Sequence, residues 1–252
     1  MIQLDNACLV YAPATPVLEG ITLVAQKGEF GSLLGPSGCG KSSLLRLITG
    51  LVEPSRGTVS VDGQPARRFR QTSGGVSLVF QEPRLLPWRN VRRNIALPLE
   101  LSKVAAADQQ ALVEASLALI GLRLEDAMKY PRMLSGGMRM RVALARALVT
   151  KPSVLLLDEP FAALDDLLRQ QLNEELLRIW AERKPTTVFV THNISEAIFL
   201  SQRVIVMASH PGRIRATVDV PFDYPRSHTL RATSEFGKLV GDVSELLRTE
   251  TR

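Results

Sequence analysis

The sequence predicts an α/β fold built around a mostly parallel sheet, and two observations predict it. First, short apolar runs recur between longer helical patterns, and each run ends near turn or polar residues. Second, several runs are apolar on both faces, which is typical of parallel strands covered by helices on both sides. The expected strands are IQLDNACLVY, EFGSLLG, GTVSVDG, GVSLVFQ, SVLLLDEP, TTVFVTH and RVIVMAS.

The composition is that of an ordinary globular protein, with 45% hydrophobic and 22% charged residues in a chain of 252. These values exclude a disordered, collagen-like or coiled-coil chain. Cys8 and Cys39 are too few for a disulfide framework or a four-cysteine zinc site, so we expect a reducing cytoplasm. The net charge of +6 suits an anionic partner such as nucleic acid, phosphate or a membrane surface, without choosing among them.

Two regions depart from the alternation of strands and helices. Residues 83–152 are helical in pattern, so they predict a helical lobe inserted into a main domain that spans 1–210. Residues 211–252 turn through several prolines and end in a helix, which predicts a C-terminal extension packed on the body or on a second copy. The apolar stripe of that helix comprises Phe236, Leu239, Val240, Val243, Leu246 and Leu247. No apolar run is long enough to span a membrane and the first residues lack a basic segment, so we expect any membrane role to come through a partner.

A glycine-rich loop joins the expected strand EFGSLLG to a helix, which is the context that a phosphate-binding P-loop requires. The loop comprises Gly35, Pro36, Ser37, Gly38, Cys39, Gly40, Lys41, Ser42 and Ser43. Glycines let backbone N–H groups converge on phosphate oxygens, and the helix directs its positive end at them. Lys41 adds a charge and the Ser42 hydroxyl a ligand for Mg²⁺, so ATP and Mg²⁺ are the expected ligands. For Cys39, a small filler and a redox-sensitive thiol both stay open.

Polar residues follow three of the other expected strands. Asp158 and Glu159 end the apolar run VLLL, at the edge where α/β sheets bind ligands. Asp158 is suited to hold Mg²⁺ and Glu159 to orient or deprotonate water. His192 and Gln81 end two further strands, and each could equally be a structural residue.

The segment LSGGM (Leu134–Met138) makes the motifs above more informative, because they now form a specific combination. Together with the P-loop, VLLLDEP, Ala163-Leu164-Asp165 and Thr191-His192, in this order, it resembles the nucleotide-binding subunit of ATP-binding cassette (ABC) transporters. The resemblance runs from Ile2 to about Ser209. It implies a P-loop NTPase core with a mostly parallel sheet, an antiparallel β subdomain and an inserted helical subdomain. It also implies an ATPase that lies in the cytoplasm, on the inner face of the cell membrane, held there by a permease.

The resemblance further implies a head-to-tail dimer with two ATP molecules between two copies of the chain. The P-loop of one copy would face Ser135, Gly136 and Gly137 of the other. Its implied site roles are Glu159 as general base, His192 as a γ-phosphate contact, Gln81 as a ligand of Mg²⁺ or the attacking water, Asp165 as a link across the dimer and Tyr11 as a stacking partner for adenine. A tyrosine packed on its neighbouring strand is the alternative for Tyr11. Met138 departs from the family, which usually has Gln there, and we expect this to tune activity only.

The segment after Gln81, QEPRLLPWRNVRRNI, resembles the nitrate, sulfonate and taurine branch of ABC importers. The tail VDVPFDYPRS resembles relatives in that branch, including importers of thiamine-pyrimidine precursors. Such systems pair two cassettes with two membrane permease subunits and an external substrate-binding protein. Four arginines crowd this segment, and either a permease contact or a solvated basic face would account for them: Arg84, Arg89, Arg92 and Arg93.

A nucleic-acid-associated ABC ATPase, of chromosome maintenance, repair or translation, is the alternative, and the positive net charge is its main support. The single cassette and the importer-like segment after Gln81 speak against it. A soluble P-loop kinase leaves LSGGM unexplained.

Overall fold

The strands form two sheets in the computed structural model, which describes residues 1–11, 15–72 and 74–248. The main sheet has six strands and is parallel except for its edge strand β10. In sheet order they are β10 (Arg213–Asp219), β9 (Arg203–Ala208), β3 (Phe30–Leu34), β8 (Thr186–Thr191), β7 (Val154–Asp158) and β6 (Val76–Val79). Because β3, β8 and β7 run parallel, the residues after them meet at one edge of the sheet.

The second sheet is antiparallel and has four strands. In sheet order they are β2 (Thr15–Ala25), β1 (Ile2–Tyr11), β4 (Arg56–Val61) and β5 (Gln64–Pro65). The two sheets, together with the helices between residues 83 and 152, confirm the α/β architecture that the sequence predicts.

Strands β2, β5 and β10 were not expected from the sequence. Pro16 and Gly20 interrupt the apolar pattern of β2, and β5 has only two residues. Strand β10 alternates exposed and half-buried residues and lies within the segment expected to form the C-terminal extension, yet it pairs with β9. Strands with one solvent-exposed face give a weaker apolar pattern in the sequence than strands covered on both faces.

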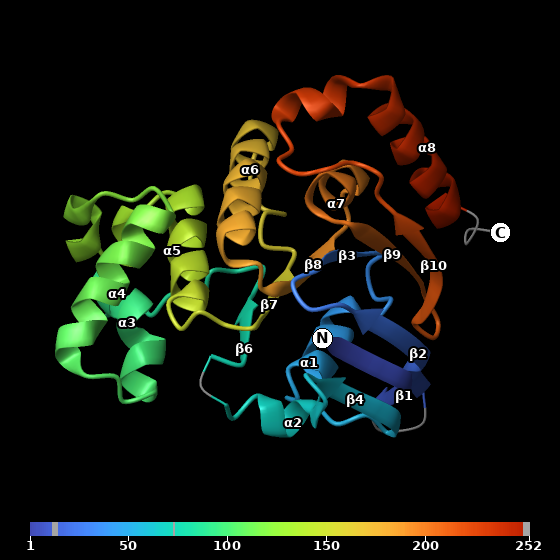
Figure 1. Cartoon of the computed structure of the whole chain (residues 1–252), viewed down its shortest axis with the longest axis horizontal. Coiled ribbons are helices and arrows are strands. Elements are labelled where there is room, and N and C mark those ends of the chain that lie inside the picture. Colours follow the sequence, from blue (N-terminus) through green and yellow to red (C-terminus); the bar gives the residue numbers. More distant parts are fainter. Residues whose placement is uncertain (12–14, 73, 249–252) are drawn as a thin grey trace.

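The helices fall into three groups (Figure 1). Beside the sheets lie α1 (Lys41–Ile48), α2 (Ala66–Phe69), α6 (Asp166–Arg183) and α7 (Ile194–Leu200). The helical lobe comprises α3 (Val91–Leu101), α4 (Ala106–Leu119), α5 (Gly136–Leu148) and the 3₁₀ turns η1 (Leu124–Met128) and η2 (Pro131–Met133). The last group is η3 (His228–Ala232) and α8 (Ser234–Arg248). Residues 83–90 of the expected lobe are not helical.

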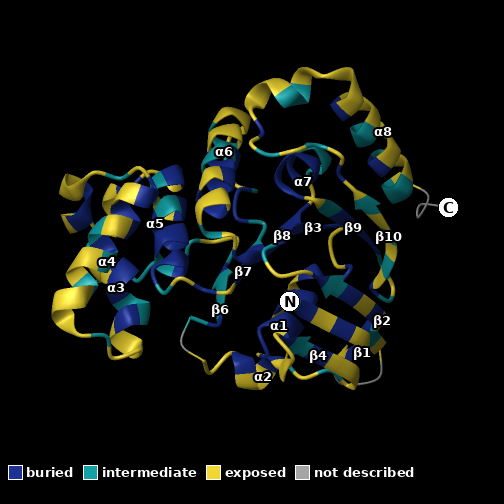
Figure 2. Ribbon diagram, viewed as in Figure 1, coloured by how far each residue is buried: buried dark blue, intermediate teal, exposed yellow. Residues whose placement is uncertain are grey.

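Helix α8 packs on the body of the same chain, over α7 and β9, which decides between the two packings that the sequence left open. Phe236 and Val243 are buried, and the other four stripe residues are half-buried against the same core. The inner main-sheet strands β3, β7, β8 and β9 are largely buried, whereas the outer faces of α4, α6 and α8 are exposed (Figure 2). Among the described residues, no helix is both long and apolar enough to cross a bilayer.

Candidate nucleotide-binding site

The glycine-rich loop connects β3 to α1, and two of its glycines admit no other residue. Gly40 precedes α1 with a φ of 94°, and a Cβ there would lie 2.6 Å from Leu18 Cδ2. At Gly35 a Cβ would lie 2.8 Å from the Met207 carbonyl oxygen. A side chain at either position would force the loop off β2 or β9, so the glycines keep the loop close to both sheets.

Helix α1 differs from four other helices at its N-terminus. Side chains cap α3, α5, α6 and α7, whereas no side chain caps α1. The first N–H groups of a helix have no partner within the helix, and they attract anions when nothing else binds them. The start of α1 therefore offers a phosphate-binding end.

Lys41, the first residue of α1, is only 6% exposed. Its ammonium donates to the carbonyl oxygens of Gly35 (2.8 Å) and Pro36 (2.9 Å), and lies 3.9 Å from Glu159 Oε1. A buried charge needs such partners. These contacts hold a positive charge at the α1 N-terminus, where phosphate oxygens would meet it.

Asp158 ends β7, and the next residue, Glu159, has a φ of 45°. This conformation is uncommon and costly for residues other than glycine, and such strain clusters at functional sites. The Glu159 N–H donates to the Val190 carbonyl at 3.0 Å, which fixes the turn against β8. Burial raises the pKa of Asp158, while a hydrogen bond from Ser42 opposes this and the Glu159 charge adds to it.

His192 follows β8 and reaches the same edge. Its Nδ1 lies 3.3 Å from Glu159 Oε2, so Glu159 stands between Lys41 and His192. Sequence reasoning missed Glu196, a buried residue behind this turn. Its carboxyl accepts a hydrogen bond from the Thr191 hydroxyl at 2.5 Å, and burial raises its pKa.

A cavity of about 420 Å³ lies over the α1 N-terminus and collects most of the predicted site. Its lining comprises Val17, Ser37, Gly38, Gly40, Lys41, Ser42, Ser43, Gln81, Asp158 and Glu159. The Ser42 hydroxyl, the Gln81 amide and the Asp158 carboxyl supply hard oxygen atoms, the ligands that Mg²⁺ prefers, so the residues fit that ion. In the described part of the chain, no cluster of His, Cys, Asp and Glu offers a rival metal site.

Other predicted residues lie outside this cavity. Ser135 and Gly136 are exposed at the start of α5, which lies in the helical lobe, beyond β6 and β7 from α1 (Figure 1). Asp165 caps α6. It lies near the LSGGM segment, the family signature, because a Cβ at Gly136 would be 3.6 Å from the side chain of Leu164, the residue before Asp165. Tyr11 is exposed at the end of β1. None of these residues lines the loop cavity of the same chain.

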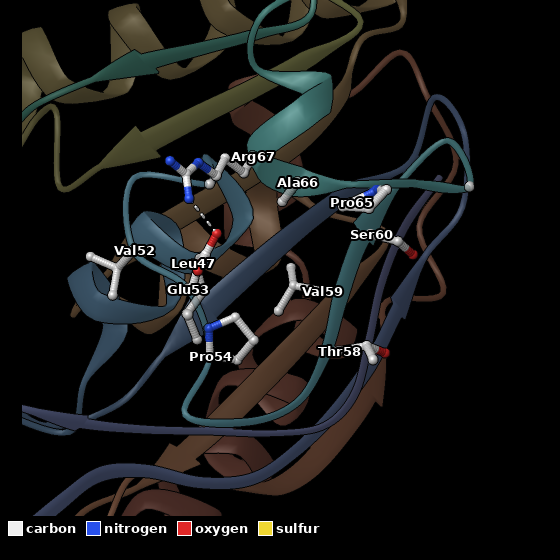
Figure 3. Close-up of a pocket in the computed structure, with 12 residues that line it drawn as sticks. Leu47, Val52, Glu53, Pro54, Thr58, Val59, Ser60, Pro65, Ala66 and Arg67 are labelled. Carbon is white, nitrogen blue, oxygen red and sulfur yellow. Dashed lines mark hydrogen bonds and ion pairs between the residues drawn. The ribbon is translucent and has the colours of Figure 1, made fainter.

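Volume alone would not choose this cavity, because a pocket of about 650 Å³ lies between α6 and residues 224–227. An apolar pocket of about 440 Å³ lies between α1, β4 and α2, with Val52, Pro54 and Val59 in its wall (Figure 3). An ion pair between Arg67 and Glu53 (2.8 Å) stands at its edge. None of the predicted site residues lines it. The convergence of Lys41 and two carboxyls, rather than volume, identifies the cavity over α1 as the candidate site.

A family model described as ABC transporter matches residues 18–162 of the chain. The chain belongs to this family. Its cassette spans the loop, the carboxyl pair and the signature, and it is an ATPase cassette. This confirms the resemblance found in the sequence motifs.

Two relatives and one solved structure show what the cassette is similar to. The nitrate import ATP-binding protein NrtD of Synechococcus elongatus is 45% identical over 83% of this chain and 76% of its own length. The aliphatic sulfonates import ATP-binding protein SsuB of Bacillus cereus is 44% identical over 95% of this chain and 94% of its own. A dimeric ATP-binding cassette in a post-hydrolysis state with ADP and Pi has a TM-score of 0.78 at 28% identity, covering 88% of this chain and 100% of that one.

The departure from the family signature, Met138, lies in the first turn of α5. Its N–H donates to the Ser135 hydroxyl at 3.3 Å, a contact that does not depend on its side chain. The side chain is half-buried and packs against the core of the helical lobe. Cys39 is 1% exposed, with its sulfur beside Gly35, which favours its role as a filler.

Proposed function

We propose that the cassette is the ATP-hydrolysing subunit of an importer, in which two copies close head to tail on two ATP molecules and reopen after hydrolysis. One observation carries the proposal: Glu159 stands between the ammonium of Lys41 and the ring of His192, over an uncapped helix N-terminus. That arrangement suits a terminal phosphate and a water that attacks it.

The residues divide the work by their chemistry. The α1 N-terminus and Lys41 bind the β- and γ-phosphates, and Gly35, Pro36 and the other loop residues shape that cradle. Glu159 accepts the proton of the attacking water, and His192 contacts the γ-phosphate. Ser42, Gln81 and Asp158 would hold Mg²⁺, which when bound neutralises charge that builds up on the phosphate oxygens.

The second half of each site would come from a partner copy. At the α5 N-terminus Ser135 and Gly136 are exposed and Gly137 is buried, and none of the three lines the loop cavity of the same chain. Asp165 lies beside the α5 N-terminus and would carry communication across the dimer. Tyr11, exposed at the end of β1, would stack on adenine. The γ-phosphate would then bridge both copies, so ATP drives closure and hydrolysis reverses it.

A permease would contact the helical lobe near Gln81. Trp88 in the segment after Gln81 is 71% exposed, and Met128 of η1 is 67% exposed. The Asn90 amide lies 3.7 Å from Met128 Sδ, so the segment that carries Trp88 packs against η1 at Asn90. Exposed apolar side chains grouped in this way mark interaction surfaces. An external substrate-binding protein would deliver the solute on the other side of the membrane.

The candidate solutes are nitrate, sulfonates such as taurine, and thiamine-pyrimidine precursors, and this subunit does not itself contact the solute. The nitrate and sulfonate relatives are equally similar, at 45% and 44% identity, so similarity alone leaves them equal. Co-purification with the permease in mild detergent, followed by ATPase assays with each solute, identifies the transported one. Hydrolysis stimulated by DNA or RNA in low salt would instead favour the nucleic-acid alternative.

The Glu159→Gln variant tests the mechanism. We expect unchanged ATP binding, hydrolysis slower by at least about 100-fold, and a dimer that accumulates with Mg·ATP, measured by light scattering. Wild type with ADP is the control and should stay monomeric. A variant that hydrolyses ATP at the wild-type rate, or one that stays monomeric with Mg·ATP even beside the permease, contradicts the proposal.

A further inference from the structure

Helix α7 has only seven residues and begins two residues after His192. Helices this short are unstable alone, so contacts at their two ends decide where they lie. At the N-terminal end the Asn193 side chain accepts from the Glu196 N–H (3.0 Å), and the Asn193 N–H donates to the Thr191 hydroxyl (3.0 Å). His192 therefore lies between two residues that are fixed to the start of α7.

The other end of α7 is held by Arg226, which lies in the segment between β10 and η3 and is only 8% exposed. Its Nη1 lies 2.9 Å from each of three carbonyl oxygens, those of Ile198, Phe199 and Ser201. The last carbonyls of a helix have no partner within the helix, and a cation there also stabilises the helix dipole. A single guanidinium thus serves nearly the whole C-terminal end of α7.

Tyr224 completes this end. Its hydroxyl donates to the Leu200 carbonyl at 2.8 Å, so carbonyls 198 to 201 all accept from Tyr224 or Arg226. The Tyr224 ring packs on Trp180 of α6, with centroids 4.9 Å apart, and the Arg226 guanidinium lies 4.1 Å from the Tyr224 ring centroid. Burial raises the pKa of Tyr224 to about 12, so its hydroxyl stays a donor at neutral pH.

The same part of the chain also contacts α7 along its side. The Arg231 guanidinium of η3 lies 3.6 Å from the centre of the Phe199 ring, and α8 packs on α7. Contacts therefore run without a break from residues 222–248, through α7, to His192 and from there to Glu159 at 3.3 Å.

We propose that residues 222–248 position the turn that carries His192, residues 191–193 between β8 and α7. Arg226 is the positioning residue: through α7 it sets where the His192 ring lies against Glu159. This rests on the proposed function, in which His192 contacts the γ-phosphate. Arg226 itself touches neither the loop cavity nor its lining. Its loss should therefore slow hydrolysis without weakening the binding of nucleotide to the loop.

Two substitutions test this. Arg226→Met keeps the length of the side chain and removes its donors, and Arg226→Lys keeps the charge at the end of α7 with fewer donors. We expect the kcat of ATP hydrolysis to fall about tenfold in Arg226→Met and less in Arg226→Lys, since small misplacements of a reacting group cost up to about 100-fold. The Kd for ATP, measured with a fluorescent analogue, should stay within twofold of wild type.

Arg178→Met is the matched control. Arg178 also donates to the end of a helix, at the Leu119 carbonyl of α4 (2.6 Å), and among the described residues it makes no hydrogen bond or ion pair with α7. Its kcat should stay within twofold of wild type. An equal loss in both variants would show that any removed arginine slows the enzyme, and would overturn the proposal.

A spectroscopic measurement reads the position of His192 directly. The sequence has three histidines, so ring ¹³C labelling gives three signals, and His192→Ala assigns the relevant one. We expect Arg226→Met to move the His192 signal while His210, in the turn between β9 and β10, keeps its position. If Arg226→Met fails to fold, the same signal and kcat are measured in Arg226→Lys and in Arg231→Met.

A folded Arg226→Met protein with wild-type kcat and an unmoved His192 signal overturns the proposal and leaves the proposed function intact. Failure of the proposed function looks different, because wild type would then lack ATPase activity or His192→Ala would hydrolyse ATP as fast as wild type.

Discussion

Two helices in this molecule have glycines at their N-termini, and the two ends differ in capping and exposure. Helix α1 has no side-chain cap and starts with the buried Lys41, next to Asp158 and Glu159. Helix α5 is capped by Ser135 and starts on the surface. The proposed phosphate cradle at α1 lies within one chain, whereas the α5 N-terminus lies outside that cavity and would reach a phosphate only in another copy. This difference is the basis for proposing a site divided between two copies.

The largest expected effect comes from a substitution in the α1 half of the proposed nucleotide site. Lys41→Ala removes the ammonium that faces the phosphates, and hydrogen bonds to charged groups contribute about 1.5–3 kcal/mol. We expect ATP affinity to fall by about 100-fold, measured by equilibrium binding. Ser135→Arg should leave the affinity of a single chain unchanged, since Ser135 lies outside the loop cavity. Similar losses in both variants would contradict the division.

Mixing the two variants sharpens the comparison. Lys41→Ala and Ser135→Arg chains should each be inactive in hydrolysis alone, by at least about tenfold. A mixed dimer keeps one intact site, made of the loop of one chain and the signature of the other. We expect an equal mixture to recover up to about a quarter of wild-type activity, because half of the dimers are mixed and each has one good site. A mixture that stays inactive would place both halves in the same chain.

Met138→Gln restores the usual residue of the family signature. The Met138 N–H bonds to Ser135 whichever side chain is present, so we expect the ATPase rate to change by less than about threefold. The affinity of a single chain for ATP should not change. A tenfold change in rate would show that the side chain at this position contacts the partner's nucleotide.

The smallest effect on the ATPase is expected from the basic segment, which belongs to neither half. Arg89 pairs with Glu100 and Arg92 with Glu114, so Arg93, which makes no ion pair among the described residues, is the arginine to reverse. Arg93→Glu should leave ATP hydrolysis within about twofold and reduce solute uptake, since exposed charges contribute little to stability. Equal loss of both activities would indicate a solvated face that supports the fold.

Local signals were sufficient for most of the fold and for half of the site. The seven expected strands are present, and the loop, Gln81, Asp158 and Glu159 line one cavity. Each follows a strand of the main sheet, so a short stretch of sequence carries both the strand and its polar end. The division into residues 1–210 and 211–252 and the roles of the site residues remain predictions.

The rest depends on contacts between residues far apart in the chain. Arg84, Arg89, Arg92 and Arg93 read as one basic cluster, yet Arg92 pairs with Glu114, 22 positions away. Nothing in the sequence around Arg226 distinguishes it from an exposed arginine, and only the fold shows that it is buried against α7. The positive φ of Glu159 is set by β8 and the loop around it. No pattern within a few residues reports such contacts.

The ammonium of Lys41 binds the carbonyl oxygens of Gly35 and Pro36, in the loop that precedes it. The Lys41 ammonium thus holds the loop in a closed conformation. The conformational entropy of ordering the loop is therefore lost when the chain folds rather than when a ligand binds. A nucleotide that enters such a rigid ring should associate rapidly, with a small change in heat capacity. Any large calorimetric signature should instead accompany the joining of two copies.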